Sequence, residues 1–246
     1  VSRNSIQKKR INKEELKDWI RPYLTINGKY PDVDEKLREI NILKYFSEIT
    51  LPPNFEKYAI ILHSYWIFSL SENQIERMEF EETKFLTMEQ EFSEDEYIAV
   101  SWNDFYNLKN VNFELHNAVK DSVDWRLPFQ QMNNELYPGE GIIDKEHLKL
   151  ISETCLKHYG NQDIELYYIF LATNNWEEDK MFEAKISELM DIIENENTER
   201  TPSLIYSIDK KWAINTDIDL KFSIIGGEEN FLTELIQMSP KGIYQI

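Results

Sequence analysis

Two carboxylates, Asp217 and Asp219, have the spacing closest to that of a chemical site. They occur in the stretch Thr216-Asp217-Ile218-Asp219-Leu220. On an extended strand, residues two apart face the same side, about 6.5–7 Å apart. Carboxylate oxygens placed this way are ligands that Mg²⁺ or Mn²⁺ accepts. The D-x-D pattern is weak, however, and a solvated strand end or an Asx turn favours the same residues.

A pair of glycines, Gly226-Gly227, precedes a predicted helix and resembles half of a phosphate cradle. Backbone amides and the positive end of the helix dipole attract anions at such a place. Glu228 and Glu229 follow directly, and their charges satisfy the dipole and repel phosphate. Neither G-x-G-x-x-G nor G-x-x-x-x-G-K-[ST] occurs in the chain, which disfavours nucleotide binding by those motifs.

The histidines and the single cysteine show no zinc-binding spacing and no H-E-x-x-H motif. Cys155 and His158 are one helical turn apart, which suits either a shared metal or core packing. His63 is either a buried base or a hydrogen-bonded core residue. Cys155 has no neighbouring base to activate its thiol. We predict no cofactor and no metal. The histidines are His63, His116, His147 and His158.

The C-terminal segment that positions these residues is predicted as a hairpin, a strand and a helix. Short strands are expected at 203–208, 211–217 and 221–225, and the first two turn at Asp209-Lys210. A last helix is expected at about 228–238. Trp212 is the second residue of the second hairpin strand, and its indole is either a core residue or an anchor in a binding groove.

The rest of the chain predicts a mixed α/β fold of the α+β type, with a central, mostly buried sheet flanked by amphipathic helices. The 246 residues suit one unit, 1–246, or two lobes, 1–127 and 128–246. Residues 124–144 are the expected hinge. Strands are expected at 57–68, 96–102 and 164–173, helices at 12–20, 34–46, 145–159 and 179–194, and a solvated helix or loop at 71–96.

The charge is strongly negative, with 27 basic and 45 acidic residues and a net charge of −18. Nucleic acid and anionic membrane are therefore disfavoured as partners, and a basic protein surface is favoured. Ten acidic and two basic residues lie between Glu72 and Glu96. The basic cluster Lys8-Lys9-Arg10 is either a binding arm or a solvated, fraying terminus, and we favour the second.

The only cysteine excludes an intramolecular disulfide and favours the cytoplasm. The first twenty residues lack the apolar core of a signal peptide. The longest apolar run, Tyr58-Ala59-Ile60-Ile61-Leu62, is too short for a membrane helix. The first residue, Val1, suggests that an initiator methionine or a longer leader has been removed.

The C-terminal motifs together resemble the closing segment of a widespread uncharacterised bacterial family. The family pattern is W-x-[VI]-x-T-[DE]-x-D, a short gap and G-G, and it matches Trp212 through Gly227. Tyr137-Pro138-Gly139-Glu140-Gly141 and the helix at 145–159 resemble the P-x-E-G turn and following helix of that family. The resemblance covers 125–246, and Ile218 stands where an aromatic residue is also common. The family has no established activity, so the resemblance implies shape alone.

These patterns lead to two functional hypotheses. The first is a non-enzymatic protein-binding module, immunity- or antitoxin-like, with a basic partner such as a toxin domain. The alternative is a divalent-metal-assisted hydrolase or transferase that uses Asp217 and Asp219, with Glu140 or His63 as base. A purely structural role for residues 212–227 is also open. The candidate binding residues are Trp212, Asp217, Asp219, Gly226, Gly227 and Glu140.

Overall fold

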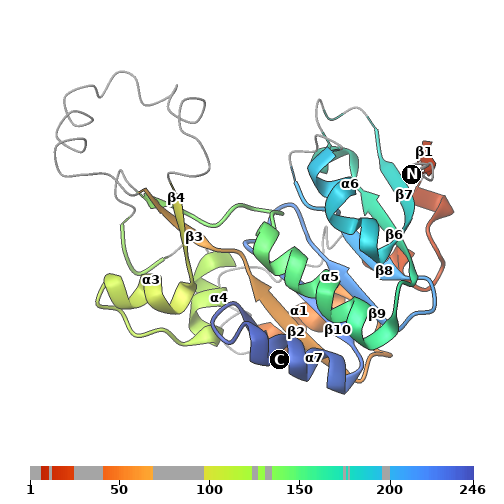
Figure 1. Cartoon of the computed structure of the whole chain (residues 1–246). Coiled ribbons are helices and arrows are strands. Elements are labelled where there is room, and N and C mark those ends of the chain that lie inside the picture. The colour runs from red at the N-terminus through yellow and green to blue at the C-terminus, as the bar shows by residue number, and fades with distance from the viewer. Residues whose placement is uncertain are drawn as a thin grey trace.

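The computed structural model describes residues 7–10, 13–24, 41–68, 97–123, 127–130, 135–173, 176, 178–195 and 200–246 (Figure 1). These residues form a mixed α+β fold, as predicted, with one large and one small antiparallel sheet. The large sheet has eight strands in the order β1-β7-β6-β8-β9-β10-β2-β11. The strands are β1 Gln7–Arg10, β2 Lys57–Leu62, β6 Asp163–Tyr168, β7 Lys180–Lys185, β8 Leu204–Ser207, β9 Trp212–Asn215, β10 Phe222–Gly227 and β11 Ile243–Gln245.

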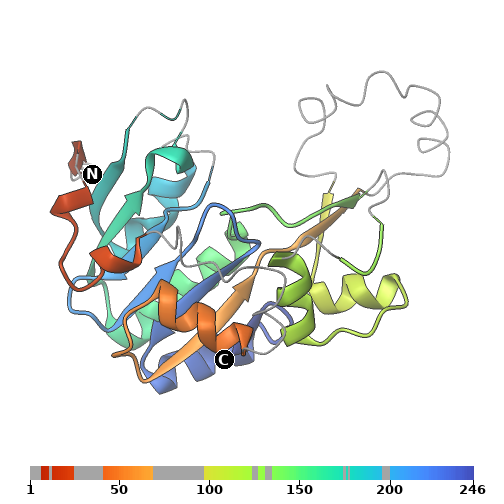
Figure 2. The same ribbon diagram turned by 180° about the vertical axis from the view of Figure 1, so that it is seen from behind.

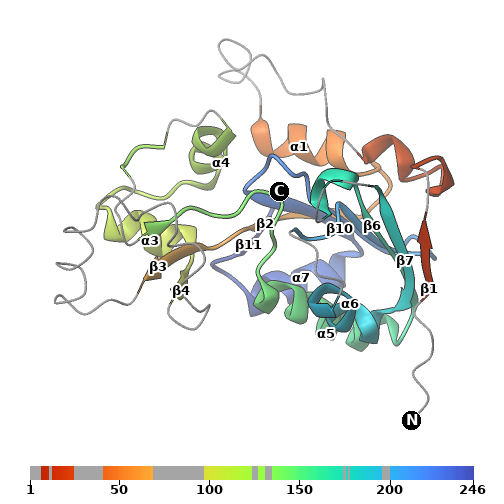
Figure 3. The same cartoon turned by 90° about the horizontal axis from the view of Figure 1, so that it is seen from above.

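The large sheet lies between two layers that bury both of its faces (Figure 3). The helices α5 (Lys145–Tyr159), α6 (Leu189–Asn195) and α7 (Glu229–Met238) cover one face. The helix α1 (Ile42–Thr50) and the segment 13–24 cover the other, as Figure 2 shows from behind. Successive strand residues point to opposite faces, so the near-continuous apolar runs of β2 and β10 supply both cores.

The small sheet continues from the large one through a bend at His63 and Ser64. Strand β2 leads into β3 (Tyr65–Phe68), which lies between β4 (Tyr97–Val100) and β5 (Glu135–Leu136). The helices α3 (Trp102–Leu108) and α4 (Leu115–Val123) lie beside this sheet (Figure 3). The ring of Tyr65 stacks on that of Phe105 with centroids 3.9 Å apart, which joins the small sheet to its helices.

Local sequence signals explain several element ends. The Asn41 side chain accepts a hydrogen bond from the Lys44 amide at the start of α1. Ser101 caps α3 in the same way. Gly160 ends α5 with a φ of 71°, a conformation that glycine adopts without steric cost. The helix at 145–159, the strand nature of 57–68 and the C-terminal hairpin, strand and helix are therefore confirmed.

The predicted helix at 179–194 is wrong in its first half. Residues 180–185 form β7, which pairs with β6 on one side and β1 on the other. Met181 and Phe182 are both buried, but in opposite cores, which strand alternation allows and a one-sided helix does not. Tertiary pairing thus overrides a helical spacing of apolar residues. Only Leu189–Asn195 is α-helical, after a 3-10 turn at Ile186–Glu188.

The N-terminal predictions also need correction. The expected helix at 12–20 is replaced by 3-10 turns at Lys13–Glu15 and Arg21–Tyr23, and proline at 22 sits in the second. The basic residues 8–10 belong to β1, which pairs with β7 rather than fraying. Helix α1 begins at Ile42 and runs on to Thr50, beyond the predicted end at 46. Residues 34–40 and 71–96 lie outside the described residues.

Further differences concern shorter elements. Strand β6 ends at Tyr168, and residues 170–172 form a 3-10 turn where the strand was predicted to continue. Helix α4 and strand β11 were not predicted. Strands from both sides of residue 128 pair in the large sheet, since β2 lies between β10 and β11. Within the described parts of the chain, no helix has the length and apolarity needed to cross a membrane.

Candidate functional site

Asp217 and Asp219 lie in a tight turn between β9 and β10 rather than on an extended strand. The Asp219 amide donates to Oδ1 of Asp217 at 3.0 Å, and the Leu220 amide donates to the Asp217 carbonyl at 3.2 Å. This geometry is the Asx turn that the sequence offered as the alternative to a metal pair. No group of three or more His, Cys, Asp or Glu side chains is arranged to hold a metal ion in the described ranges.

The turn closes one side of a small pocket, here called the turn pocket. Its volume is about 110 Å³. The pocket contains both predicted carboxylates, but neither Glu140 nor Trp212 lines it. Its other walls come from the segment that ends at Leu24, from the 3-10 turn after β6 and from the start of β8. The lining residues are Leu24, Ile169, Leu171, Ser203, Thr216, Asp217, Ile218 and Asp219.

A buried hydrogen-bonded chain runs from the turn pocket to the bend between the two sheets. The hydroxyls of Thr216 and Ser223 are 3.0 Å apart, and Ser223 Oγ is 2.9 Å from Nε2 of His63. Nδ1 of His63 is 2.7 Å from the Gly139 carbonyl. Because a carbonyl only accepts, Nδ1 carries the proton and Nε2 accepts from Ser223. The Thr216 hydroxyl then supplies the proton shared with Ser223.

His63 is neutral at physiological pH in this environment. Burial lowers its pKa to about 4, against the opposing influence of Asp144. Both ring nitrogens have partners and the side chain is inaccessible to solvent. The geometry therefore makes His63 a hydrogen-bonded core residue that fixes the bend, and it does not present a base to a substrate.

Asp144 supports the same bend. Its Oδ2 accepts from the Ser64 amide at 2.9 Å and contacts Nδ1 of His147 at 3.1 Å. Burial of Asp144 raises its pKa, but the interactions with His147, His63 and the Ser64 amide together leave the pKa lowered. Asp144 occupies the N-cap position of α5, but its carboxylate makes no capping bond to the helix and binds the Ser64 amide, just before β3, instead.

Glu140 lies behind the turn and reinforces it. Its carboxylate is 3.1 Å from Nζ of Lys221, a side chain only 5% exposed. Its carbonyl accepts from Nη1 of Arg200 at 2.8 Å, and the same Arg200 nitrogen donates to the Ile218 carbonyl. Gly141 has a φ of 69°, and a Cβ there would lie 3.0 Å from Cα of Ile218. The 139–141 loop therefore packs directly against the 216–221 turn.

Gly226 and Gly227 belong to β10 and are used for close packing. A Cβ on Gly226 would lie 2.4 Å from Cδ2 of Phe55, and one on Gly227 would lie 2.9 Å from Cδ1 of Phe231. Two aromatic rings thus occupy the space that side chains would need. Trp212 is wholly buried in the core beneath α5 and α7. These three residues are separate from the turn pocket.

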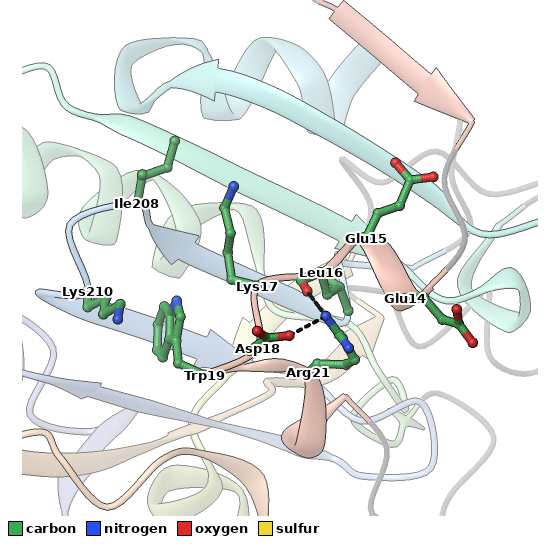
Figure 4. A pocket seen from close by; sticks show the side chains of 9 residues that line it. All are labelled: Glu14, Glu15, Leu16, Lys17, Asp18, Trp19, Arg21, Ile208 and Lys210. Carbon is green, nitrogen blue, oxygen red and sulfur yellow. Dashed lines mark hydrogen bonds and ion pairs between the residues drawn. The ribbon is translucent and has the colours of Figure 1, made fainter.

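A second, wider pocket of about 510 Å³ lies where the segment 13–24 crosses the sheet (Figure 4). Four of its charged side chains, those of Lys17, Asp18, Arg21 and Lys210, make contacts within the chain. Nη2 of Arg21 donates to the Leu16 carbonyl at 2.8 Å and to Asp18 at 2.6 Å. Lys17 pairs with Glu165 at 3.0 Å, and Nζ of Lys210 lies 5.8 Å from the Trp19 ring centroid. These contacts mainly hold the segment 13–24 against the sheet.

Residues of the turn pocket that sequence reasoning missed come from distant parts of the chain. Leu24, Ile169, Leu171 and Ser203 carry no local pattern that distinguishes them from ordinary core residues. In comparisons with known proteins, no family model, no curated protein and no solved structure matches the chain. The resemblance of residues 125–246 to a bacterial family stays a prediction.

Proposed function

We propose that this protein is a non-enzymatic binding module that recognises a basic protein surface, in the manner of an immunity protein or antitoxin. The observation that carries the proposal is the net charge of −18 and the concentration of ten acidic residues between Glu72 and Glu96. A field of this sign accelerates encounter with a cationic partner and repels nucleic acid.

The described strands on either side of the acidic stretch support the proposal. In the sequence the stretch follows β3 and precedes β4, and these neighbouring strands pair Phe68 with Tyr97. Ile98 on β4 is 57% exposed and Leu136 on β5 is 39% exposed. Their partners Ile67 and Trp66 are consecutive residues of β3, so the two apolar side chains lie on opposite faces of the small sheet. Exposed apolar side chains are typical of the centre of protein interfaces.

The proposal is tested by capture with the full-length chain from lysate of the source cells, with elution by increasing salt. We expect one basic protein in a stoichiometric complex, with an affinity that falls steeply between 50 and about 300 mM salt because the attraction is screened. Repeated recovery of the chain alone would contradict the proposal.

A matched pair of variants locates the charge effect. Changing Glu72, Glu76, Glu79, Glu81 and Glu82 to Gln is expected to weaken the complex about tenfold or more. Changing five exposed acidic residues elsewhere to Gln alters the net charge by the same amount. This control is expected to weaken the complex less than about threefold. Equal effects would show that binding follows total charge and not this stretch. The control residues are Glu14, Glu15, Glu146, Glu153 and Glu194.

The alternative function, metal-assisted hydrolysis or group transfer, is favoured by one observation: Asp217 and Asp219 line the same pocket. It predicts Mn²⁺ or Mg²⁺ binding that Asp217→Asn or Asp219→Asn weakens. Isothermal titration with Mn²⁺ measures this directly. Identical titration curves for the parent and both variants would dispose of the metal-site alternative.

A further inference from the structure

We propose that the turn pocket receives a single lysine or arginine side chain from the basic partner, an inference that rests on the proposed function. The pocket's size is the first argument. Its volume of about 110 Å³ is well below the roughly 300–1,000 Å³ of typical small-molecule sites. This space suits one side chain and excludes a nucleotide.

The chemistry of the walls is the second argument. Leu24 is buried, and Ile169 and Leu171 are half-buried, so apolar groups form the inner part. Asp219 is exposed, and Asp217 is half-buried with its Oδ1 accepting from the Asp219 amide. A lysine or arginine combines an apolar stem with a charged end. The stem would contact the apolar wall, and the cation would lie beside the carboxylates.

The charge of the pocket rejects the other common occupants. A phosphate or carboxylate ligand would approach Asp217 and Asp219 with the same sign of charge, which costs free energy. A purely apolar side chain would strip water from these carboxylates without supplying a partner. A cationic side chain avoids both costs, so the pocket favours it among protein side chains.

The pocket is held in shape before any partner arrives. The Thr216 amide donates to the Ser203 carbonyl at 3.0 Å, and Arg200 donates to the Ile218 carbonyl. The Thr216 hydroxyl belongs to the buried chain that ends at His63. A site that is already ordered loses little conformational entropy on binding. This rigidity separates the turn pocket from an ordinary exposed pair of carboxylates.

A neighbouring aromatic residue extends the surface. Phe170 lies between Ile169 and Leu171 and is 40% exposed, whereas the two flanking residues line the pocket. Its amide donates to Oδ1 of Asp179 at 2.7 Å, which fixes the turn. The ring is therefore available to contact the partner next to the inserted side chain.

The test is an NMR titration of the ¹⁵N-labelled full chain with short capped peptides. The probes are acetyl-Gly-Lys-Gly-amide, its arginine counterpart and its norleucine counterpart, which keeps the stem but lacks the charge. We expect saturable shifts for the amides of 169–171, 203 and 216–219 with lysine or arginine. Norleucine is expected to bind at least fivefold more weakly, and equal affinity for it would overturn the inference.

Charge variants sharpen the test. Asp217→Asn keeps an oxygen acceptor for the Asx turn, and Asp219→Asn changes an exposed side chain, so both are expected to fold. Each substitution should weaken binding of the lysine peptide about threefold or more. Asp209→Asn is the matched control, because Asp209 is an exposed turn residue outside the pocket, and it should change nothing. A control effect as large as that of Asp219→Asn would overturn the inference.

The outcomes separate this inference from the proposed function. If a captured partner binds Asp219→Asn as tightly as the parent and the peptides cause no localised shifts, the binding function stands and the pocket inference falls. If lysine peptides saturate the pocket but no basic partner is captured, the preference of the pocket for a cationic side chain stands and the proposed function falls.

Discussion

At the scale of single residues, the protonation state of buried His63 affects the stability of the fold. Nδ1 donates to Gly139 and Nε2 accepts from Ser223, whereas in a protonated ring Nε2 would donate to Ser223 Oγ and the serine hydroxyl would turn to donate to Thr216. The charged groups that act on His63 are Asp144, which favours the proton, and His147 and Lys221, which disfavour it. Burial is the largest influence, and it favours the neutral ring.

This arrangement predicts loss of stability in mild acid. The pKa of His63 is lowered to about 4 in the folded protein, whereas an unfolded histidine titrates near 6.5. Between these values the unfolded chain binds a proton that the folded chain refuses. The contribution of neutral His63 to the free energy of unfolding is therefore fully present above pH 6.5. It decreases as the pH falls toward 4, by at most about 3 kcal/mol.

Urea denaturation at pH 7.5, 6.0 and 5.0 measures this effect. The variant His63→Gln keeps hydrogen-bonding groups but cannot titrate, so it should be less stable at pH 7.5 and show a flatter dependence on pH. His116→Gln is the control, because His116 lies on α4 away from this chain of hydrogen bonds. If the stability of His63→Gln depended on pH as steeply as that of the parent, the assignment of the pH effect to His63 would be contradicted.

At the scale of elements, the segment 13–24 is attached to the sheet by both apolar and charged contacts. Leu16 and Ile20 are buried in the core beneath it, and Trp19 makes an edge contact with Tyr206 at 5.5 Å between centroids. Lys17 reaches Glu165, a carboxylate on β6 that is only 1% exposed. The hydroxyl of Tyr206 donates to the same carboxylate. The segment therefore supplies the cation for a charge in the centre of the sheet.

Removing that cation is expected to destabilise the protein. Lys17→Met should lower the free energy of unfolding by about 1–3 kcal/mol, because Glu165 stays buried with fewer partners. The double variant Lys17→Met with Glu165→Gln should recover part of the loss, since no charge is then left unpaired. Urea denaturation measures both, and Lys44→Met, at an exposed pair on α1, is the control. Equal losses for Lys17→Met and Lys44→Met would contradict the role of Lys17.

The same scale shows why some elements were predictable and others were not. Helix α5 carries its own signals, with an apolar face and a glycine at its end, and its predicted bounds of 145–159 are confirmed. Strand β7 has apolar residues that also fit a helix, and only its pairing with β1 and β6 makes it a strand. Helix α4 is only nine residues long, so it offers few positions from which a helical spacing can be recognised.

At the scale of the whole molecule, charge and site are separate properties. The net charge of −18 follows from composition, and the proposal of a cationic partner rests on it. The turn pocket, in contrast, combines residues from positions 24, 169–171, 203 and 216–219. The sequence identified the two aspartates of this pocket as candidates. The Asx turn is a local contact that the sequence offered as an alternative, whereas the apolar wall opposite the aspartates appears only when the distant segments meet.

The sequence by itself determined the properties that depend on neighbouring residues or on simple totals: the acidity, the α+β class, the long helix and the C-terminal hairpin, strand and helix. The tertiary structure alone decided that Gly226 and Gly227 make room for aromatic rings, that Trp212 is core, and that His63 is bonded to Gly139 and Ser223. The physical reason is that packing and buried hydrogen bonds join residues far apart in the chain, whose contacts leave no local pattern.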